Sequence, residues 1–410
     1  MKVLQINRNF NNGGAAIAAR RLHKKLNQIE GVSSKFLCRH TSVGSNDDLQ
    51  QLYPGVNGRL VSVGIDRLER LTGYQYLFQK SINSITNTNA FKDADIVHFH
   101  ITHGGYIDQY FLPEIAKLKP VVWTFHDMWA ITGRCAHSYD CDKWKTGCGH
   151  CPTPKTYPSQ FIDRSAYLWE LKNKLYNEVE AHVVCPSDWL GQKVEQSFIK
   201  NWGRSIIPNS ADLSVFKPYE NIAGLRRRFE IPSDKTVLLF VAHGGVENTY
   251  KGFDYLKEAI KKSKNRSDIF LVVIGGSKKG NLDYLGIDGI SVGEVNDELV
   301  LAEYYSAVDY YVLPSVQENL PLTIIESLGC GTPVLAFGVG GIPEMIENQS
   351  TGYLANINQK ESLMTAIDWA CSINDYDYNV MSIRCREFAI ANYSIDNYVQ
   401  SYISLYESLI

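Results

Sequence analysis

Short, almost continuously apolar runs alternate with helical patterns along nearly the whole chain, and the alternation starts again in the second half. Such runs are typical of parallel strands that helices bury on both faces. We predict helices between the strands, including Phe253 to Lys262 and Pro321 to Leu328, with the proline in the first helical turn. The predicted strands are Val3 to Ile6, Ile96 to Phe99, Val121 to Phe125, Val183 to Cys185, Ser205 to Ile207, Thr236 to Ala242, Ile269 to Ile274, Tyr310 to Leu313 and Val334 to Ala336. The chain is therefore predicted to be α/β, with two doubly wound, Rossmann-like domains.

The length of 410 residues also favours two domains, because a single core usually stops growing well below that size. Turn-forming residues are concentrated between Ile207 and Pro218, which predicts the connection between the domains. We expect an N-terminal domain at 1–208 and a C-terminal domain at 209–392. Apolar residues recur at helical spacing in 393–410, which predicts a final amphipathic helix.

Composition and charge exclude several classes of protein. The 41 basic and 44 acidic residues leave a net charge of -3, so no nucleic-acid partner is expected. No stretch approaches the roughly 20 apolar residues that span a bilayer, and nine cysteines, an odd number, do not suggest a secreted disulfide framework. A cytoplasmic protein is expected. Peripheral contact with the inner face of the membrane stays open, because one predicted helix carries Tyr167, Trp169, Lys172, Lys174 and Tyr176.

Two glutamates, Glu318 and Glu326, follow the predicted strand Tyr310 to Leu313 in the segment ENLPLTIIE. Open α/β sheets bind ligands at the carboxyl ends of their strands, and the start of the next helix presents free backbone N–H groups to an anion. Glu318 would lie in the loop, and Glu326 about two turns along the helix could reach ligand hydroxyls. Most glutamates are merely solvated, so the spacing alone decides nothing.

Three other loops follow predicted strands. Lys251 ends a glycine-bearing loop after the strand at 236–242, where its ammonium could neutralise phosphate. Gly13 and Gly14 follow the first strand and allow close approach of a ligand to the backbone. His126 follows the strand at 121–125. No G-x-G-x-x-G fingerprint follows the first strand, which argues against a nicotinamide dehydrogenase.

Four cysteines, Cys135, Cys141, Cys148 and Cys151, lie within 17 residues and end in a C-x-x-C pair. Four thiolates in this arrangement could hold a tetrahedral, structural zinc ion and fix a long loop. Free thiols, two disulfides and an iron–sulfur cluster are the alternatives.

The segment from Glu318 to Glu326, with the following GCGTPV at 329–334 and GVGGIPE at 338–344, resembles the donor-site signature of family-4 glycosyltransferases. The phrase HDMW at 126–129, continued through the cysteine loop, resembles a subgroup of that family from bacterial exopolysaccharide, capsule and O-antigen pathways. The resemblance covers almost the whole chain. It implies the GT-B fold, in which two Rossmann-like domains face each other across a cleft and the C-terminal helix packs back toward the N-terminal domain.

The resemblance also implies roles for single residues. Glu318 and His126 would contact the transferred sugar, and Glu326 would bind the nucleotide ribose. The diphosphate would be held by Lys251 and by the backbone amides of Leu322 and Thr323. Gly13 and Gly14 would lie beside the donor phosphates and the acceptor. His98, His100 and His103, which could imitate a metal site, would form polar lining near the acceptor. Gly245 stands where the family usually has an arginine, a role that His243 or Asn248 could fill.

The function so implied is that of a retaining hexosyltransferase. It would transfer a sugar from a UDP- or GDP-sugar to a glycan or lipid-linked acceptor in surface polysaccharide synthesis, with no cofactor required for catalysis. Two alternatives remain open. A nucleotide-sugar epimerase of the same fold would convert the donor without an acceptor, and a catalytically inactive nucleotide-sugar-binding protein would bind without turnover.

Overall fold

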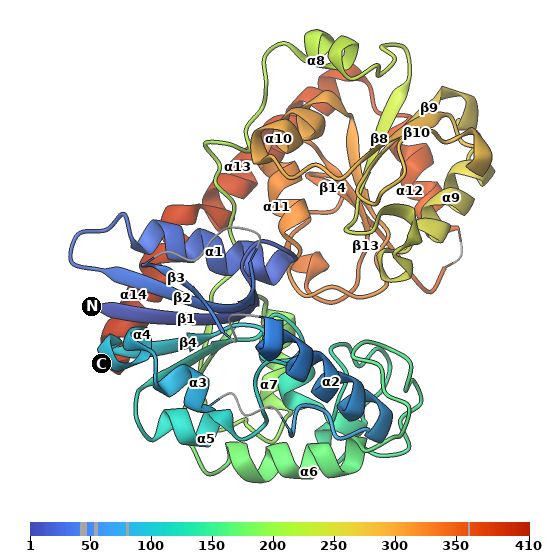
Figure 1. Ribbon diagram of the computed structural model, residues 1–410. Coiled ribbons are helices and arrows are strands. Elements are labelled where there is room, and N and C mark those ends of the chain that lie inside the picture. Colours follow the sequence, from blue (N-terminus) through green and yellow to red (C-terminus); the bar gives the residue numbers. More distant parts are fainter. Residues whose placement is uncertain (42–46, 53–55, 79–81, 360) are drawn as a thin grey trace. The chain divides into compact units, whose positions relative to one another are not determined.

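The computed structural model describes residues 1–410 except 42–46, 53–55, 79–81 and 360, and it leaves out the side chains of 56–60, 62, 82 and 83. The chain divides into two compact units, the first comprising Met1–Pro208 with Tyr398–Ile410 and the second Asn209–Asn397. Each unit contains one seven-stranded sheet (Figure 1). The division after Pro208 falls within the turn-forming stretch of the sequence, and the chain returns to the first unit at Tyr398.

The sheet of the first unit is parallel and has the strand order β3-β2-β1-β4-β5-β6-β7. Its strands are β1 (Lys2–Asn9), β2 (Ser33–His40), β3 (Leu49–Gln51), β4 (Ile96–Phe99), β5 (Val121–Thr124), β6 (His182–Cys185) and β7 (Gly203–Ile206). Its helices are α1 (Gly14–Leu26), α2 (Val56–Thr72), α3 (Ile82–Thr86), α4 (Asn89–Asp93), α5 (Phe111–Ala116), α6 (Ser165–Tyr176), α7 (Asp188–Glu195) and, from Tyr398 onward, α14 (Ile395–Leu409).

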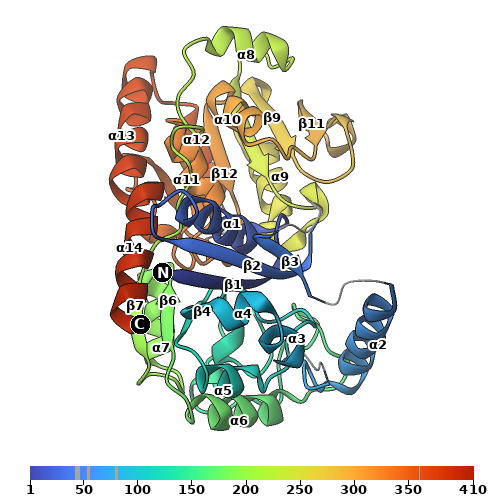
Figure 2. The same cartoon turned by 60° about the vertical axis from the view of Figure 1, so that its left-hand side comes forward.

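The central strands β4 and β5 are buried along their whole length, as their apolar sequences require. The C-terminal helix α14 lies along this unit (Figure 2), and two of its tyrosines form hydrogen bonds with the same two strands. The Tyr406 hydroxyl lies 2.7 Å from Nδ1 of His98 on β4, and the Tyr402 hydroxyl lies 2.8 Å from the hydroxyl of Thr124 on β5. The final helix is therefore part of the core of the first unit.

The sheet of the second unit has the order β10-β11-β9-β8-β12-β13-β14, parallel except for β10. Figure 1 shows α9 and α12 on one side of this sheet and α10, α11 and α13 on the other. The strands are β8 (Thr236–Val241), β9 (Ile269–Ile274), β10 (Gly280–Asn281), β11 (Gly289–Gly293), β12 (Tyr310–Leu313), β13 (Val334–Phe337) and β14 (Gly352–Ala355). The helices are α8 (Ile222–Arg228), α9 (Phe253–Lys262), α10 (Glu298–Ala307), α11 (Leu322–Gly329), α12 (Ser362–Ala370) and α13 (Asp375–Tyr393).

Two sequence-based expectations are corrected by this fold. Pro321 is the extended residue that precedes α11 and does not lie in its first turn. The aromatic and lysine residues of α6 do not form an exposed stripe, because Lys172 and Tyr176 are fully buried. Within the described residues, no helix is both long and apolar enough to cross a bilayer.

Candidate active site

Both sheets reverse their strand order beside the first strand of the unit, at β1/β4 and at β8/β12. Ligands of open α/β sheets bind outside the carboxyl ends of the strands at such a switch point. The loops that carry the predicted site residues follow these strands. Gly13, Gly14 and His126 belong to the first unit, whereas Lys251, Glu318, Leu322, Thr323 and Glu326 belong to the second.

In the second unit, the loops after β8 and β12 contact each other through their backbones. Gly252, directly after Lys251, has φ +70°, and a Cβ atom there would lie 1.9 Å from the carbonyl oxygen of Pro314. Only glycine combines this conformation with so close an approach. Gly252 also precedes α9, so the helix start fixes the position of Lys251.

This contact brings Lys251 and Glu318 together, although 67 residues separate them in the sequence. The ammonium of Lys251 donates a hydrogen bond of 2.6 Å to Oε1 of Glu318, and the two side chains are 26% and 16% exposed. Both groups are therefore charged, oriented and partly open to solvent at the switch point of the sheet.

The glycines of the 338–341 segment hold the backbone of Glu318. Gly340 has φ +60°, and its absent Cβ would lie 1.7 Å from the carbonyl oxygen of Glu318. The N–H of Gly341 donates to that same oxygen at 3.3 Å. The glycine motif downstream of the glutamate pair thus serves to position the first glutamate.

Helix α11 begins immediately after this loop. Pro321 precedes it, and no side chain forms a capping hydrogen bond at this helix start. The backbone N–H groups of Leu322 and Thr323 lie at this end, where the helix dipole is positive. The Thr323 hydroxyl accepts a hydrogen bond of 2.8 Å from the buried Tyr311 hydroxyl, which anchors the first turn. Glu326, on the same helix, is 4% exposed.

Sequence reasoning missed two further features of this edge. Gly275 and Gly276, after β9, have φ +109° and +75°, and a Cβ on Gly275 would lie 1.8 Å from the carbonyl oxygen of Ala242 in the loop after β8. Ser315, after β12, is fully buried, and its hydroxyl lacks a hydrogen-bond partner among the described residues. The glycine pair directly after the apolar run Ile269–Ile274 was the available sequence signal.

In the first unit, α1 starts at an open glycine pair. Gly13 precedes the helix with φ +94°, and neither Gly13 nor Gly14 has an atom within 4 Å of where a Cβ would stand. No side chain caps this helix start, and the backbone of both glycines is uncovered on the side where a side chain would stand.

The four histidines after or within β4 and β5 are paired with other groups. His103 Nε2 lies 2.8 Å from the Asp127 carboxylate, and His100 Nδ1 lies 3.1 Å from Nε2 of His126. His98 is fully buried against α14, so the expectation that it lines a polar cleft is wrong. Among the described residues, no three histidine, cysteine or acidic side chains are placed so that they could hold a metal ion.

The protonation of His126 follows from its neighbours. The side-chain amide of Gln5 can form hydrogen bonds on both sides in only one orientation. Its nitrogen then donates to Nε2 of His100 and to the carbonyl oxygen of Ala19, both at 3.1 Å, and its oxygen accepts from the backbone N–H of His23. Nε2 of His100 is therefore an acceptor. Burial lowers the pKa of His100 well below its usual range, so the neutral ring carries its proton on Nδ1 and donates it to His126. Burial also lowers the pKa of His126 to about 4, which leaves a neutral ring with an Nδ1–H donor.

The sequence profile described as Glycosyltransferase Family 4 matches residues 12–215, and the profile described as Glycosyl transferases group 1 matches residues 235–372. The chain belongs to glycosyltransferase family 4. These matches and the relatives below do not favour the epimerase alternative.

The relatives of this glycosyltransferase include WcaC of Escherichia coli K12, named as a colanic acid biosynthesis glycosyl transferase. It is 26% identical, and the alignment covers 100% of both chains. A UDP-Gal:alpha-D-GlcNAc-diphosphoundecaprenol alpha-1,3-galactosyltransferase of Escherichia coli is 24% identical over 53% of this chain and 57% of its own length.

Solved structures show that the glycosyltransferase has the GT-B fold. Sucrose-phosphate synthase from Thermosynechococcus elongatus has a TM-score of 0.71 and 18% identity, with 100% of this chain and 98% of that chain covered. Anabaena Alr3699/HepE in complex with UDP has a TM-score of 0.66 and 16% identity, with both chains covered at 100%.

The structure accounts for the missing arginine of this glycosyltransferase. Gly245 has φ +60°, and a Cβ there would lie 2.5 Å from the carbonyl oxygen of Gly275. The loop therefore has no room for any side chain at this position. The amide of Asn248 donates to the His243 carbonyl and accepts from the Tyr250 N–H, so Asn248 shapes the loop. His243 is exposed.

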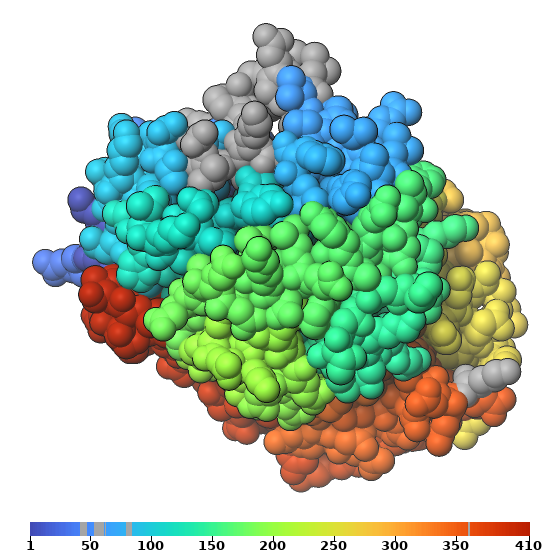
Figure 3. All heavy atoms as spheres, turned by 90° about the horizontal axis from the view of Figure 1, so that it is seen from below, coloured from blue at the N-terminus to red at the C-terminus, as the bar shows by residue number. Residues whose placement is uncertain are grey.

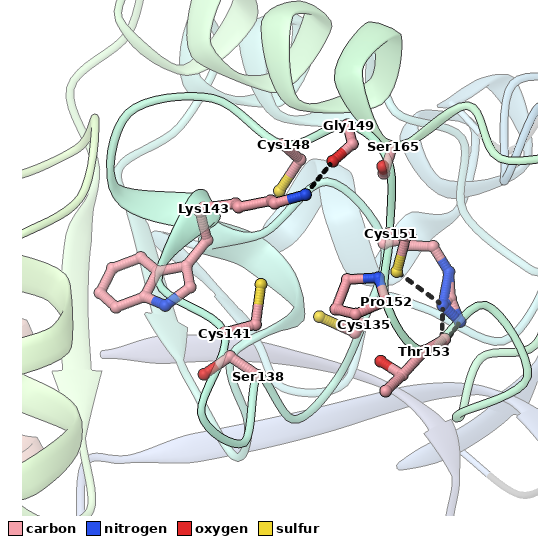
Figure 4. Close-up of a pocket in the computed structure, with 12 residues that line it drawn as sticks. Cys135, Ser138, Cys141, Lys143, Cys148, Gly149, Cys151, Pro152, Thr153 and Ser165 are labelled. Carbon is pink, nitrogen blue, oxygen red and sulfur yellow. Dashed lines mark hydrogen bonds between the residues drawn. The ribbon is translucent and has the colours of Figure 1, made fainter.

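The four cysteines of the glycosyltransferase line one small cavity in the first unit, between the loop that follows η1 (Trp129–Ile131) and α6 (Figure 4). All four are free thiols. Burial raises the pKa of Cys135, and it raises that of Cys148 to about 12. Burial lowers the pKa of Lys172 on α6 to about 7, while the thiols of Cys148 and Cys135 act in the opposite direction.

Proposed function

We propose that this glycosyltransferase transfers a hexosyl residue from a UDP- or GDP-sugar to a glycan or lipid-linked saccharide of a surface polysaccharide, with retention of anomeric configuration. The observation that carries the proposal is the Lys251–Glu318 pair at the switch point of the second unit. The relatives named for colanic acid synthesis and for a diphosphoundecaprenol-linked acceptor support the choice of acceptor class.

The second unit would bind the donor. Lys251 would neutralise the diphosphate together with the backbone N–H groups of Leu322 and Thr323, since a helix start favours phosphate. Glu318, held beside Lys251, would accept hydrogen bonds from the hydroxyls of the transferred sugar. Glu326, on the same helix, would accept hydrogen bonds from the ribose.

Retention would follow from where charge develops. As the sugar–phosphate bond breaks, negative charge grows on the departing diphosphate, and Lys251 stabilises it most strongly at that stage. The acceptor hydroxyl would attack the face from which the diphosphate leaves and pass its proton to a phosphate oxygen. This course needs neither a carboxylate nucleophile nor a metal ion.

The first unit would contribute neutral hydrogen-bonding groups. His126, held by its contact with His100, would meet a sugar hydroxyl as a neutral ring and so without adding charge. The open glycine pair Gly13 and Gly14 would let a ligand approach the start of α1. An acceptor carried on a lipid would require the enzyme to work at the inner face of the membrane as a peripheral protein.

The first test is release of nucleoside diphosphate by the purified enzyme from a panel of UDP- and GDP-sugars. Slow hydrolysis of one donor, abolished by Lys251→Ala and by Glu326→Ala, is the expected result. Lys264→Ala and Glu258→Ala, at exposed positions in and after α9, are the matched controls and should behave as wild type. Equal hydrolysis by all variants would place the donor elsewhere.

A second test addresses retention and turnover. With the donor known, NMR of the product should show the anomeric configuration of the donor, and an inverted product would contradict the mechanism. Tight binding of one donor without turnover, in the presence of candidate acceptors, would instead identify a nucleotide-sugar-binding protein.

A further inference from the structure

The cysteine loop closes on itself and on α6. Cys135, Cys141, Cys148 and Cys151 line a cavity of about 20 Å³, which is enough for one water-sized occupant. Figure 4 shows the sulfur atoms of Cys135, Cys141 and Cys148 directed toward the same space, with Cys151 on its other side. The loop is fastened to α6 at Gly133, where a Cβ would lie 2.2 Å from the carbonyl oxygen of Ser165.

Two cations are buried beside these thiols. Arg134 is 1% exposed and donates to the carbonyls of Thr153, Pro154 and Thr156 and, at 3.9 Å, to the sulfur of Cys151. Lys172 is 0% exposed. Neither cation forms an ion pair with a carboxylate in the described part of the chain.

The partners of Lys172 are neutral groups of the neighbouring η1 segment. Its ammonium donates to the carbonyl oxygens of Trp129 and Thr132 at 2.6 and 3.0 Å, and it lies 3.5 Å from the centroid of the Trp129 ring. Buried cations without counter-charge are costly. The carboxylates that act on the two cations do so through space, Asp127 on Lys172 and Asp163 on Arg134, and the thiols of Cys148 and Cys135 act on Lys172 more strongly than Asp127 does. Negative charge on these sulfur atoms would therefore stabilise the buried cations.

The cavity is also lined by hydrogen-bond donors that lack acceptors. Trp144 Nε1 and Arg134 Nε are buried, and neither has a partner among the described residues. The N–H of Gly133 already donates to the sulfur of Cys148 at 3.3 Å. Donors of this kind surround metal-bound thiolates in proteins, where they stabilise the sulfur charge. Neutral thiols accept such bonds only weakly.

We propose that Cys135, Cys141, Cys148 and Cys151 together bind one Zn²⁺ ion as a structural, tetrahedral site. Four thiolates and Zn²⁺ carry a formal charge of −2, which Arg134 and Lys172 balance, and binding releases the four thiol protons. In this structure the four sulfur atoms do not form a coordination sphere, so binding requires rotation of cysteine side chains toward the cavity. The site fixes the segment after His126, because the N–H of Met128 donates to the carbonyl of Ala136 within the same loop.

The test is metal analysis of the full-length enzyme, purified without chelator, by inductively coupled plasma mass spectrometry. About one zinc per chain is expected, and Cys148→Ser and Cys141→Ser should lose it. Cys371→Ser removes a partly buried thiol outside the loop and should keep the zinc. In the wild-type protein, the amount of zinc released should rise in proportion to the number of thiols modified by a mercurial. This measurement does not depend on whether the cysteine variants fold.

A second pair of variants tests the charge balance. Lys172→Met should weaken zinc binding by about 10- to 100-fold in a chelator competition, whereas Lys174→Met, exposed on the same helix, should not. Three results would each overturn the proposal. They are a metal-free protein in which the four loop cysteines react as free thiols, two disulfides among these cysteines found by mass spectrometry, and iron with acid-labile sulfide in place of zinc. The readout is independent of the donor-hydrolysis test, so either proposal can fail alone.

Discussion

Both sheets reverse their strand order beside the first strand of the unit, but the two switch points are built from opposite kinds of polar group. In the second unit a lysine and a glutamate meet as charged partners, both partly exposed. In the first unit His100 and His126 meet as neutral rings, because burial lowers the pKa of each. The fold therefore supplies the same edge twice. The residues placed there make one edge suited to an anion and the other to uncharged hydroxyls.

This difference implies a division of labour within the glycosyltransferase. Lys251 and Glu318 form a hydrogen bond of 2.6 Å between charged groups. An arriving diphosphate should change this pair strongly, because hydrogen bonds between charged groups are stronger than those between neutral groups. A neutral histidine can orient a sugar hydroxyl without competing for the phosphate. The predictions below change one edge at a time.

The largest effect is expected from Glu318→Gln. Turnover should fall by about 100- to 1000-fold, as for removal of one preorganised polar group. Affinity for the nucleoside diphosphate should rise by severalfold, because Lys251 is no longer engaged by a carboxylate. Steady-state kinetics and calorimetry measure the two. Glu387→Gln, exposed on α13, is the control, and a parallel loss of diphosphate affinity would show that the two groups do not compete.

A smaller loss should follow from Gly340→Ala. The new Cβ would lie 1.7 Å from the Glu318 carbonyl oxygen at φ +60°, so the backbone of Glu318 must move. Misplacement of a site residue by about 1 Å can cost ~100-fold in rate. Gly338→Ala, whose Cβ would meet nothing closer than 3.9 Å, should retain activity. Similar rates for both variants would mean that the glycine segment does not position Glu318.

Part of the donor-side edge and several strands could be predicted from the sequence alone. The residues Lys251 and Glu318 were identified from strand-end loops and family motifs, and the strands β4, β9 and β12 were predicted at their observed bounds. Strands β2, β3, β10, β11 and β14 were not predicted. They are short or mix polar with apolar residues, and their place in the sheet depends on partners far away in the chain.

Contacts between distant segments could not be predicted from the sequence for the same reason. The bond between His98 and Tyr406 joins residues 308 positions apart, and no local pattern fixes that register. The glycine pair at Gly275 acquires meaning only when Ala242 is seen against it. The outcome for Lys172 shows the limit of periodicity, since a lysine in an amphipathic pattern is fully buried beside the cysteine loop.

Acid should destabilise the first unit more than the second. His23 and His126 have pKa values lowered by burial to about 4, and those of His98 and His100 lie well below their usual range. The folding stability that depends on these histidines being neutral is complete above the pKa of about 6.5 of an unfolded histidine, and it is lost as pH falls toward about 4. At pH 5, His23 and His126 would each lose on the order of 2 kcal/mol. Glu69, whose pKa burial raises to about 7, offsets one such loss.

The second unit has one histidine in its sequence, His243, which is exposed. Burial raises the pKa of Asp309, which favours this unit at low pH. Hydrogen exchange at pH 7.5 and pH 5.0 should therefore show protection lost in β4 and β5 before β8 and β12. Equal loss in both sheets would contradict the neutral-histidine interpretation.

The smallest effect is expected at the start of α1. Gly13→Ala should cost on the order of 1–3 kcal/mol in stability because its φ of 94° and ψ of 153° lie in a region that only glycine adopts readily, whereas Gly14→Ala should leave thermal stability unchanged or slightly improved. Differential scanning calorimetry measures both. A Gly14→Ala variant of normal stability but reduced transfer would place a ligand at this helix start, and normal transfer would remove Gly14 from the site.

The central claim is that Lys251 binds the diphosphate of the donor. Calorimetric titration of the full-length enzyme with UDP and GDP, compared with UMP and GMP, tests it most directly. One diphosphate should bind wild type and Lys264→Ala equally, and Lys251→Ala at least about tenfold more weakly, as expected for loss of one charge-assisted hydrogen bond. The monophosphate should be affected less. Equal diphosphate affinity in Lys251→Ala and wild type would contradict the assignment of the second unit's charged edge to the donor.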